Sequence, residues 1–108
     1  MTRARLLTRR SKDPVARALK EWLAVPPAAA RVLAALYDQR GQVVPRAELM
    51  LASGQTPAGL ALSIRRLREA MEPKSIANEP AVGFRLTAAG LAECERALAD
   101  AAARAEAA

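Results

Sequence analysis

Apolar residues recur every three or four positions along most of the chain, which is the spacing of helices that bury one face. Prolines and short polar stretches interrupt this pattern and divide it into segments. The expected helices cover residues 14–24, 27–39, 45–52, 57–71 and 88–105. The pattern therefore predicts a mostly helical protein.

Capping residues support several of these helix boundaries. Asp13 and Thr56 each precede a proline, and a cap followed by proline favours a helix start. Thr87 is expected to cap the last helix. Gly41 is expected to end the helix at 27–39, and Leu49, Met50 and Leu51 are candidates for packing on the helix at 45–52.

Two stretches favour strands instead. Residues 42–44 are short and β-branched, which predicts a brief strand. Residues 75–86, SIANEPAVGFRL, predict a hairpin with Ile76 on its first arm and residues 78–80 in its turn. The alternating positions of the second arm are Val82, Phe84 and Leu86.

The order of these elements predicts a winged helix-turn-helix, mostly α with a small β-hairpin and with extra N- and C-terminal helices. The helix-turn-helix is expected at about 45–71 and the wing at about 75–86, within a single domain of residues 13–108. Residues 1–12 carry five basic residues and no acid, which predicts a flexible basic arm. The arm residues that are candidates for DNA contact are Arg3, Arg5, Arg9 and Arg10. The alternative is a solvated tail that only aids solubility.

The net charge of +6 suits a polyanion or an acidic membrane surface as a partner. No apolar run is long enough to cross a membrane, and none comes after the basic N-terminus as a secretory signal requires. We therefore expect a cytoplasmic protein with no membrane partner.

The chain has one cysteine, Cys94, and no histidine. This composition argues against an internal disulfide, a cysteine-based metal site and the usual general base. No serine has a histidine partner, and there is no glycine-rich phosphate loop. We therefore expect no catalytic residues, no metal, no cofactor and no enzymatic activity. No set of polar residues suggests a small-molecule pocket either.

Three segments carry a resemblance to a known family: GQVVPRAELM at 41–50, LALSIRRLREAMEP at 60–73 and SIANEPAVGFRL at 75–86. They resemble the DNA-binding domain of OmpR/PhoB-type response regulators. That family has a capped helix reading R-E-E-L, a helix containing I-x-R-L-R-x-x-L and a hairpin closing on G-x-G-Y-R-L. The resemblance implies that the helix at 57–71 enters the major groove of DNA. The positions where it implies base and nearby phosphate contacts are Leu62, Ser63, Arg65 and Arg66, with a backbone contact at Arg68.

The chain departs from that family in several ways. It shows no receiver domain or phosphoacceptor aspartate, so control by phosphorylation is not expected, and the helix at 14–24 stands where the family has a four-stranded sheet. Glu79 and Pro80 occupy the region where the family has a basic wing residue, so the implied DNA contact does not extend to the minor groove. The stretch RLTAAGLAECERAL resembles the segment after the wing in MarR- and PadR-like regulators, where a terminal helix often builds the dimer.

The residues of the helix at 57–71 support DNA contact independently of the family. Arginine can hold guanine through two hydrogen bonds, which suits Arg65 and Arg66, and an exposed Leu62 can meet thymine methyl groups. Thr56 starts this helix, and helix N-termini favour phosphate. The alternative is an ordinary ion pair between Arg65 and Glu69, with Arg66 solvated.

Other residues have two interpretations each. Arg46 and Arg85 are either phosphate contacts or ordinary surface charges. Trp22 either docks the first helix or forms part of an interface, and Cys94 is expected to pack as a small apolar residue on the last helix.

We therefore expect a sequence-specific, double-stranded DNA-binding transcriptional regulator of bacterial or phage type. A homodimer through helices 14–24 and 88–105 is expected, because a lone winged helix has no obvious need of these two amphipathic helices. The alternative is a winged-helix adaptor that binds RNA polymerase or another regulator.

Overall fold

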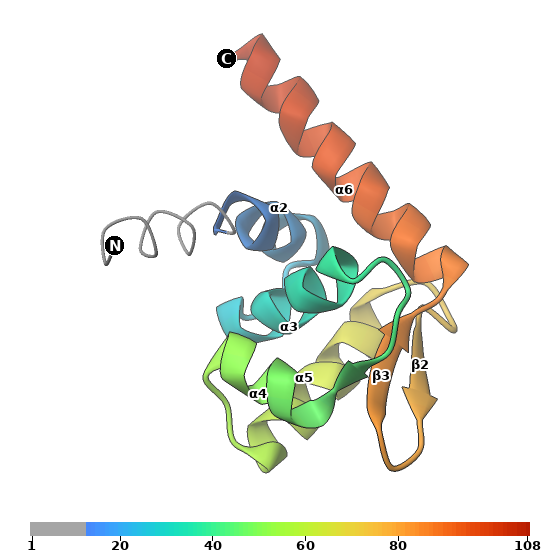
Figure 1. The fold of residues 1–108 in the computed structure, drawn as a ribbon. Helices are drawn as coiled ribbons and strands as arrows, with labels where there is room; N and C mark the ends of the chain where they lie inside the picture. The colour runs from blue at the N-terminus through green and yellow to red at the C-terminus, as the bar shows by residue number, and fades with distance from the viewer. Residues whose placement is uncertain (1–12) are drawn as a thin grey trace, which may run out of the picture.

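A computed structural model describes residues 13–108. Figure 1 shows helices gathered around a small sheet at one side. The elements are α2 (Asp13–Leu23), α3 (Pro27–Asp38), β1 (Val44–Pro45), α4 (Arg46–Ser53), α5 (Pro57–Ala70), β2 (Ile76–Glu79), β3 (Gly83–Leu86) and α6 (Ala88–Ala107). The predicted mostly helical class is confirmed, and the sheet has three strands rather than the two of a bare hairpin.

The sheet is antiparallel with the order β1-β3-β2. Val44 pairs with Phe84 and Ile76 pairs with Leu86, so β3 is the central strand. The brief strand expected at 42–44 forms two residues long at Val44–Pro45. Its pairing with β3 ties the segment before α4 to the hairpin.

The hairpin turn lies later than the sequence predicted. The Val82 N–H donates to the Glu79 carbonyl at 3.0 Å, which closes a turn with Pro80 and Ala81 at its centre. Ala81 has a φ of 65°, the left-handed conformation that the second central position of a type II turn requires, and proline suits the first central position of that turn. Val82 belongs to this turn and is 53% exposed, so its expected place beside Phe84 and Leu86 was wrong.

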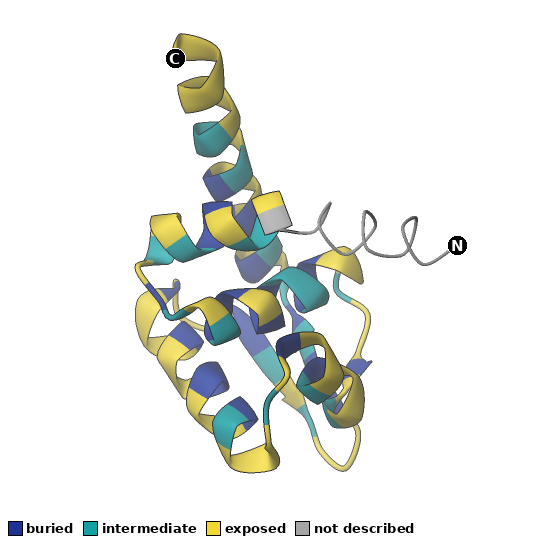
Figure 2. Cartoon of the chain, turned by 90° about the vertical axis from the view of Figure 1, so that its left-hand side faces the viewer, coloured by how far each residue is buried: buried dark blue, intermediate teal, exposed yellow. Residues whose placement is uncertain are grey.

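The core is built around α3, which packs against α2, α4, α5 and β3. Val32, Leu33 and Leu36 of α3 are completely buried, as are Leu49 of α4 and Leu67 of α5. Figure 2 shows buried residues on the inward sides of these helices and exposed residues on their outward sides. One-sided burial is what the helical spacing of apolar residues predicted.

Two local expectations were wrong. Leu51 is 84% exposed, because two residues along a helix turn the side chain roughly 200° away from the buried Leu49. Gly41 does not end α3, since the helix stops at Asp38 with Gln39 as its C-cap. Gly41 instead takes a φ of 92° in the following loop, next to Arg40 at 52°.

The last helix, α6, packs against α2 near its start and then extends away from the rest of the molecule (Figures 1 and 2). Its expected cap forms, because the Thr87 hydroxyl accepts a hydrogen bond from the Gly90 N–H at 3.3 Å. From Ala102 onward every residue is exposed. In the part of the chain from 13 to 108, no helix combines the length and apolar character that crossing a membrane requires.

Candidate nucleic-acid interface

The turn between α4 and α5 is fixed by hydrogen bonds that span it. Gly54 takes a φ of 69° after α4, and the Gln55 N–H donates back to the Met50 carbonyl at 3.0 Å. The Gln55 side chain donates to the Gly59 carbonyl at 3.1 Å and accepts from the Ser63 hydroxyl at 3.0 Å. One glutamine therefore joins the turn to the first two turns of α5, which sets the direction of that helix relative to α4.

The helix α5 has one buried and one exposed face. Its inward residues are Leu60, Ser63, Ile64 and Leu67. Its outward residues are Ala58, Ala61, Leu62, Arg65, Arg66, Arg68 and Glu69. Leu62 is 41% exposed, so the outward face combines a large apolar side chain with three arginines and a single acid.

Arg65 and Arg66 lie on this outward face without ion-pair partners. The ion pairs found between residues 13 and 108 are Arg40–Glu95, Arg85–Glu79 and Arg104–Asp100. The Arg65–Glu69 pair considered from the sequence is not among them. Both guanidinium groups therefore remain available to an anionic or hydrogen-bond-accepting partner.

Arg46 and Arg68 hold the hairpin against α4 and α5. Their guanidinium groups lie 4.8 Å and 5.8 Å from the centre of the Phe84 ring, within cation–π range. Arg46 also donates to the Asn78 side-chain oxygen at 3.0 Å, and Arg68 donates to the Ile76 carbonyl at 3.3 Å. Their positions along the chain do not reveal this role, because nothing local connects them to β2 or β3.

Arg85 of the hairpin is already paired. Its Nε donates to the Glu79 carboxylate at 2.9 Å, and the two residues lie diagonally across β2 and β3. The charge of Arg85 is therefore balanced within the hairpin. A phosphate contact by Arg85 would compete with this ion pair.

Two further candidate residues have clear structural roles. Ser63 is only 4% exposed and its hydroxyl donates to the Gln55 side-chain oxygen. The resemblance implied a DNA contact at Ser63, but its side chain lies on the inward face of α5 and points to the turn. Thr56 is exposed at the start of α5, where its hydroxyl accepts from the Gly59 N–H at 3.2 Å. The arm residues Arg3, Arg5, Arg9 and Arg10 lie outside the described residues.

Glu93 of α6 is a structural link between three helices that the sequence did not suggest. It is buried, and its carboxylate accepts from the Glu72 N–H at 2.9 Å and from the Trp22 Nε1 at 3.4 Å. Glu72 lies just beyond the C-terminal end of α5. One side chain therefore connects α2 and α6 to the end of the helix that carries the exposed arginines.

Two titratable groups near α6 also have structural roles. Cys94 is buried as expected, and burial raises the pKa of its thiol to about 12, with Glu93 and Glu95 adding to the rise. The Tyr37 hydroxyl donates to Glu95 at 2.8 Å, and this hydrogen bond raises the pKa of the phenol. At neutral pH both groups are therefore protonated.

Comparisons with models of protein families, with curated proteins and with solved structures found no match.

Proposed function

We propose that the chain is a winged helix-turn-helix protein that binds double-stranded DNA sequence-specifically and regulates transcription. The order α3, β1, α4, α5, β2, β3 supports this proposal, as does a sheet in which β1 and β2 flank β3. In this interpretation α4 and α5 are the helix-turn-helix and the hairpin is the wing. The helix α5 then enters the major groove.

The observation that carries the proposal is the outward face of α5. Arg65 and Arg66 have no ion-pair partner among the described residues, and Leu62 is exposed one turn before them. Each arginine can hold a guanine edge with two hydrogen bonds, and Leu62 can contact a thymine methyl group. The face is rigidly presented, because Gln55 fixes the turn before α5.

The remaining candidate arginines contribute differently. Arg46 and Arg68 position the wing and offer only the remaining part of each guanidinium group to a phosphate. Arg85 is neutralised by Glu79. We therefore assign base contact to Arg65 and Arg66 and a positioning role to Arg46 and Arg68.

We further propose that the protein acts as a homodimer through α2 and α6. The end of α6 extends beyond the other helices (Figure 1), and Trp22 of α2 is 39% exposed while bonded to Glu93 of α6. An alanine-rich helix end gains stability by packing on another helix. Sedimentation should show a dimer at tens of micromolar, and a monomer there would overturn this part of the proposal.

The test of DNA binding is selection from a random duplex pool at about 50 and about 200 mM salt, where phosphate-only binding weakens steeply. We expect an enriched motif at both concentrations, with half-sites about one helical turn apart if a dimer binds. Arg65→Gln with Arg66→Gln should remove the motif, whereas Lys74→Gln with Arg96→Gln should keep it. Both double variants change two exposed residues and lower the net charge equally.

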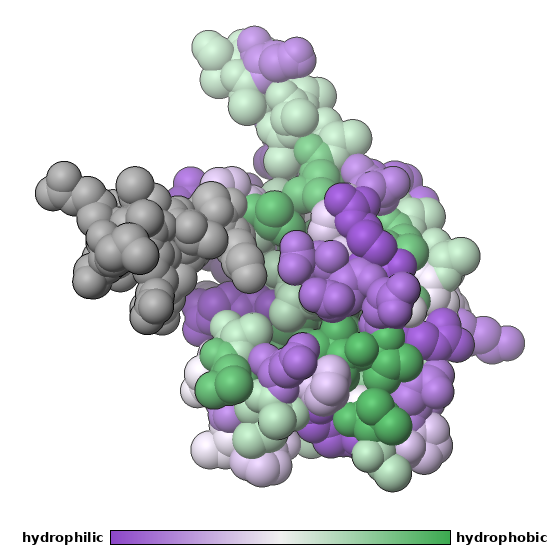
Figure 3. Space-filling view, in the orientation of Figure 1, coloured by the Kyte–Doolittle hydropathy of each residue, from purple (hydrophilic) through white to green (hydrophobic). Residues whose placement is uncertain are grey.

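A different function is favoured by the surface formed by α4 and the wing tip. Leu51 and Val82 are the two most exposed large apolar residues of the described chain, and Figure 3 shows hydrophobic surface on this side. The Arg46 N–H donates to the Val82 carbonyl at 3.3 Å, so the tip lies against the start of α4. This surface suits a protein partner such as RNA polymerase or another regulator. In that case the selection yields no motif, and Leu51→Ser with Val82→Ser abolishes partner binding while the arginine variants do not.

A further inference from the structure

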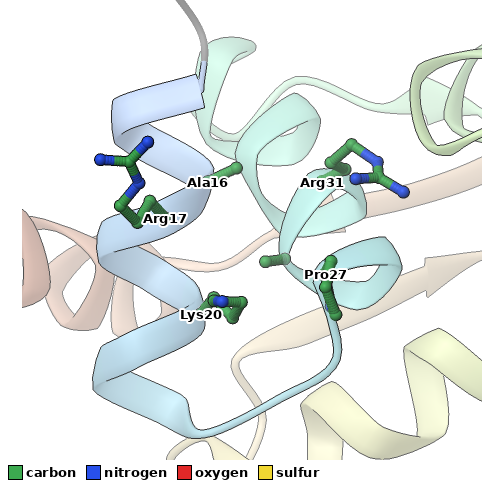
Figure 4. A pocket seen from close by; sticks show the side chains of 6 residues that line it. Ala16, Arg17, Lys20, Pro27 and Arg31 are labelled. Carbon is green, nitrogen blue, oxygen red and sulfur yellow. The ribbon is translucent and has the colours of Figure 1, made fainter.

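An open hollow of about 170 Å³ lies between α2 and α3, on helices that the proposed DNA contact does not use. The residues that line it are Ala16, Arg17, Lys20, Pro27, Ala30 and Arg31. Figure 4 shows Arg17 and Lys20 on α2 and Arg31 on α3. Half of the lining residues are therefore cationic.

Among residues 14–108, no acidic side chain forms an ion pair with any of these three cations. Glu21 comes after Lys20 on α2, but it is exposed and not among the residues lining the hollow. Like charges held close together repel, and a bound anion removes that repulsion.

The start of α3 adds to the positive potential at the same place. Its N-cap is Pro26, which makes no side-chain hydrogen bond, and its first turn contains no acidic residue. Pro27 at the first helical position lines the hollow. The positive end of the α3 dipole therefore lies at the edge of the cationic cluster, and no acidic side chain of its own first turn balances it.

The floor of the hollow allows an anion to enter. Ala16, Pro27 and Ala30 are small or apolar, and they contribute no carboxylate that would repel negative charge. Arginine binds phosphate oxygens through two parallel hydrogen bonds, and lysine adds a point charge. The lining thus matches a phosphate group better than a cation or an apolar ligand.

We propose that the hollow between α2 and α3 binds a phosphate group through Arg17, Lys20 and Arg31. In Figure 4 the side chains of Arg17 and Arg31 extend to opposite sides, so binding draws them inward over the hollow. The sequence led us to expect no such pocket, because its cations come from two helices and meet only when α2 and α3 pack.

The phosphate has two sources that share this chemistry. A second hollow, lined by Ala24, Val25, Pro26, Arg66, Glu69 and Ala70, joins the α2–α3 loop to α5. Pro26 lines the second hollow and Pro27 lines the first, so the two hollows adjoin, and Arg66 and Glu69 of α5 line the second. One source is thus the backbone of a duplex bound to α5. This possibility rests on the proposed function. The other source is a free phosphate-bearing molecule.

The experiment is nuclear magnetic resonance titration of the full ¹⁵N-labelled chain with pyrophosphate, and separately with a duplex, at fixed ionic strength. We expect shifts of the backbone amides of residues 16–31 and of the Arg17 and Arg31 side-chain N–H groups. Arg17→Gln with Arg31→Gln should weaken binding at this site by at least about tenfold, since two bidentate donors are lost. Lys74→Gln with Arg96→Gln is the control with the same net charge, and it should bind like the unaltered chain.

The outcomes separate the two proposals. Pyrophosphate shifts confined to the hollow support a free phosphate ligand, even if no duplex binds and the proposed function fails. Shifts in the hollow with the duplex alone support contact with the DNA backbone. Arg17→Gln with Arg31→Gln should then reduce the slope of log affinity against log salt concentration by the equivalent of about one or two phosphate contacts. If neither titrant shifts the hollow, or if both double variants lose binding equally, the site is overturned. If the duplex shifts only amides of α5, the proposed DNA binding is supported and the phosphate site is overturned.

Discussion

The carboxylate of Glu93 on α6 accepts a hydrogen bond of 2.9 Å from the backbone N–H of Glu72, directly after the end of α5. Its second oxygen accepts from Trp22 on α2 at 3.4 Å. Glu93 is buried, and removing it leaves two donors without partners. Three helices that are distant in the sequence depend on this one side chain.

Glu93→Ala should therefore lower the free energy of unfolding by about 1–3 kcal/mol, because two part-buried hydrogen bonds to a charged group are lost. Urea denaturation measures this change. Glu106→Ala, at an exposed position of the same helix, should stay within about 0.5 kcal/mol. Equal losses in the two variants would show that the Glu93 hydrogen bonds contribute nothing.

Gly83→Ala should disrupt the pairing of β1 with β3. A Cβ at Gly83 would overlap the Val44 carbonyl, which is backbone and has no room to move. We expect the free energy of unfolding to fall by roughly 3 kcal/mol or more, as for other severe steric conflicts. Gly54→Ala is the comparison, because open space surrounds Gly54 and only its φ of 69° opposes a side chain. That change should cost about 1–2 kcal/mol. A smaller loss for Gly83→Ala than for Gly54→Ala would contradict the prediction.

The two threonine caps should differ in strength. Thr56→Ala removes a single cap hydrogen bond and should cost about 1 kcal/mol. The Thr87 hydroxyl accepts from the Gly90 N–H and also donates to the Lys74 carbonyl at 2.7 Å. Thr87→Ala should therefore cost about 1 kcal/mol more than Thr56→Ala, as one further hydrogen bond is lost. Thermal unfolding of both variants under the same conditions gives the difference.

Arg68→Gln should destabilise the hairpin although Arg68 is exposed. Its guanidinium lies over Phe84 and donates to the Ile76 carbonyl, whereas Arg66 on the same helix has neither contact. We expect a loss of about 1 kcal/mol for Arg68→Gln and almost none for Arg66→Gln. Hydrogen exchange of the β2 and β3 amides should become faster in the first variant alone. Unchanged exchange in Arg68→Gln would rule out the positioning role.

Stability should fall as pH rises above about 9. The unfolded Cys94 thiol loses its proton near its ordinary pKa of 9.0, while burial keeps the folded thiol protonated up to about 12. The unfolded chain then binds fewer protons than the folded one. The contribution of Cys94 to the free energy of unfolding is therefore complete below pH 9 and is lost between pH 9 and 12. Cys94→Ala should make the decline shallower by up to about 1.4 kcal/mol per pH unit. The pKa of Tyr37 is also raised in the folded chain, so the stability of the Cys94→Ala variant should still decline somewhat above pH 10. Parallel pH profiles for the variant and the unaltered chain would show that Cys94 is not a cause.

Local features of the sequence predicted most of the helices and the caps at Thr56 and Thr87. These features depend on near neighbours along the chain, so spacing and capping rules apply to them directly. The outward position of Leu62, Arg65 and Arg66 came from the same helical wheel.

Features that depend on packing between distant segments could not be predicted in this way. Arg46 was expected to be a phosphate contact or a surface charge, and the resemblance implied a DNA-backbone contact at Arg68. Neither expectation included Phe84, which lies on a strand distant in the sequence. No sequence pattern singled out Glu93, because its partners Trp22 and Glu72 come from distant segments. The resemblance placed Ser63 among the DNA contacts and did not indicate that its hydroxyl bonds to the Gln55 side chain.

The projecting end of α6 is an arm anchored by the buried first half of the same helix. Glu93, Cys94 and Ala97 are buried, whereas every residue from Ala102 onward is exposed. From Ala97 to Ala107 the helix runs about 15 Å at 1.5 Å per residue. A tilt of about 10° at Ala97 would move the tip by about 3 Å, roughly half of one helical turn. A partner that binds the far end of α6 would therefore load the segment whose Glu93 carboxylate accepts from the Glu72 N–H.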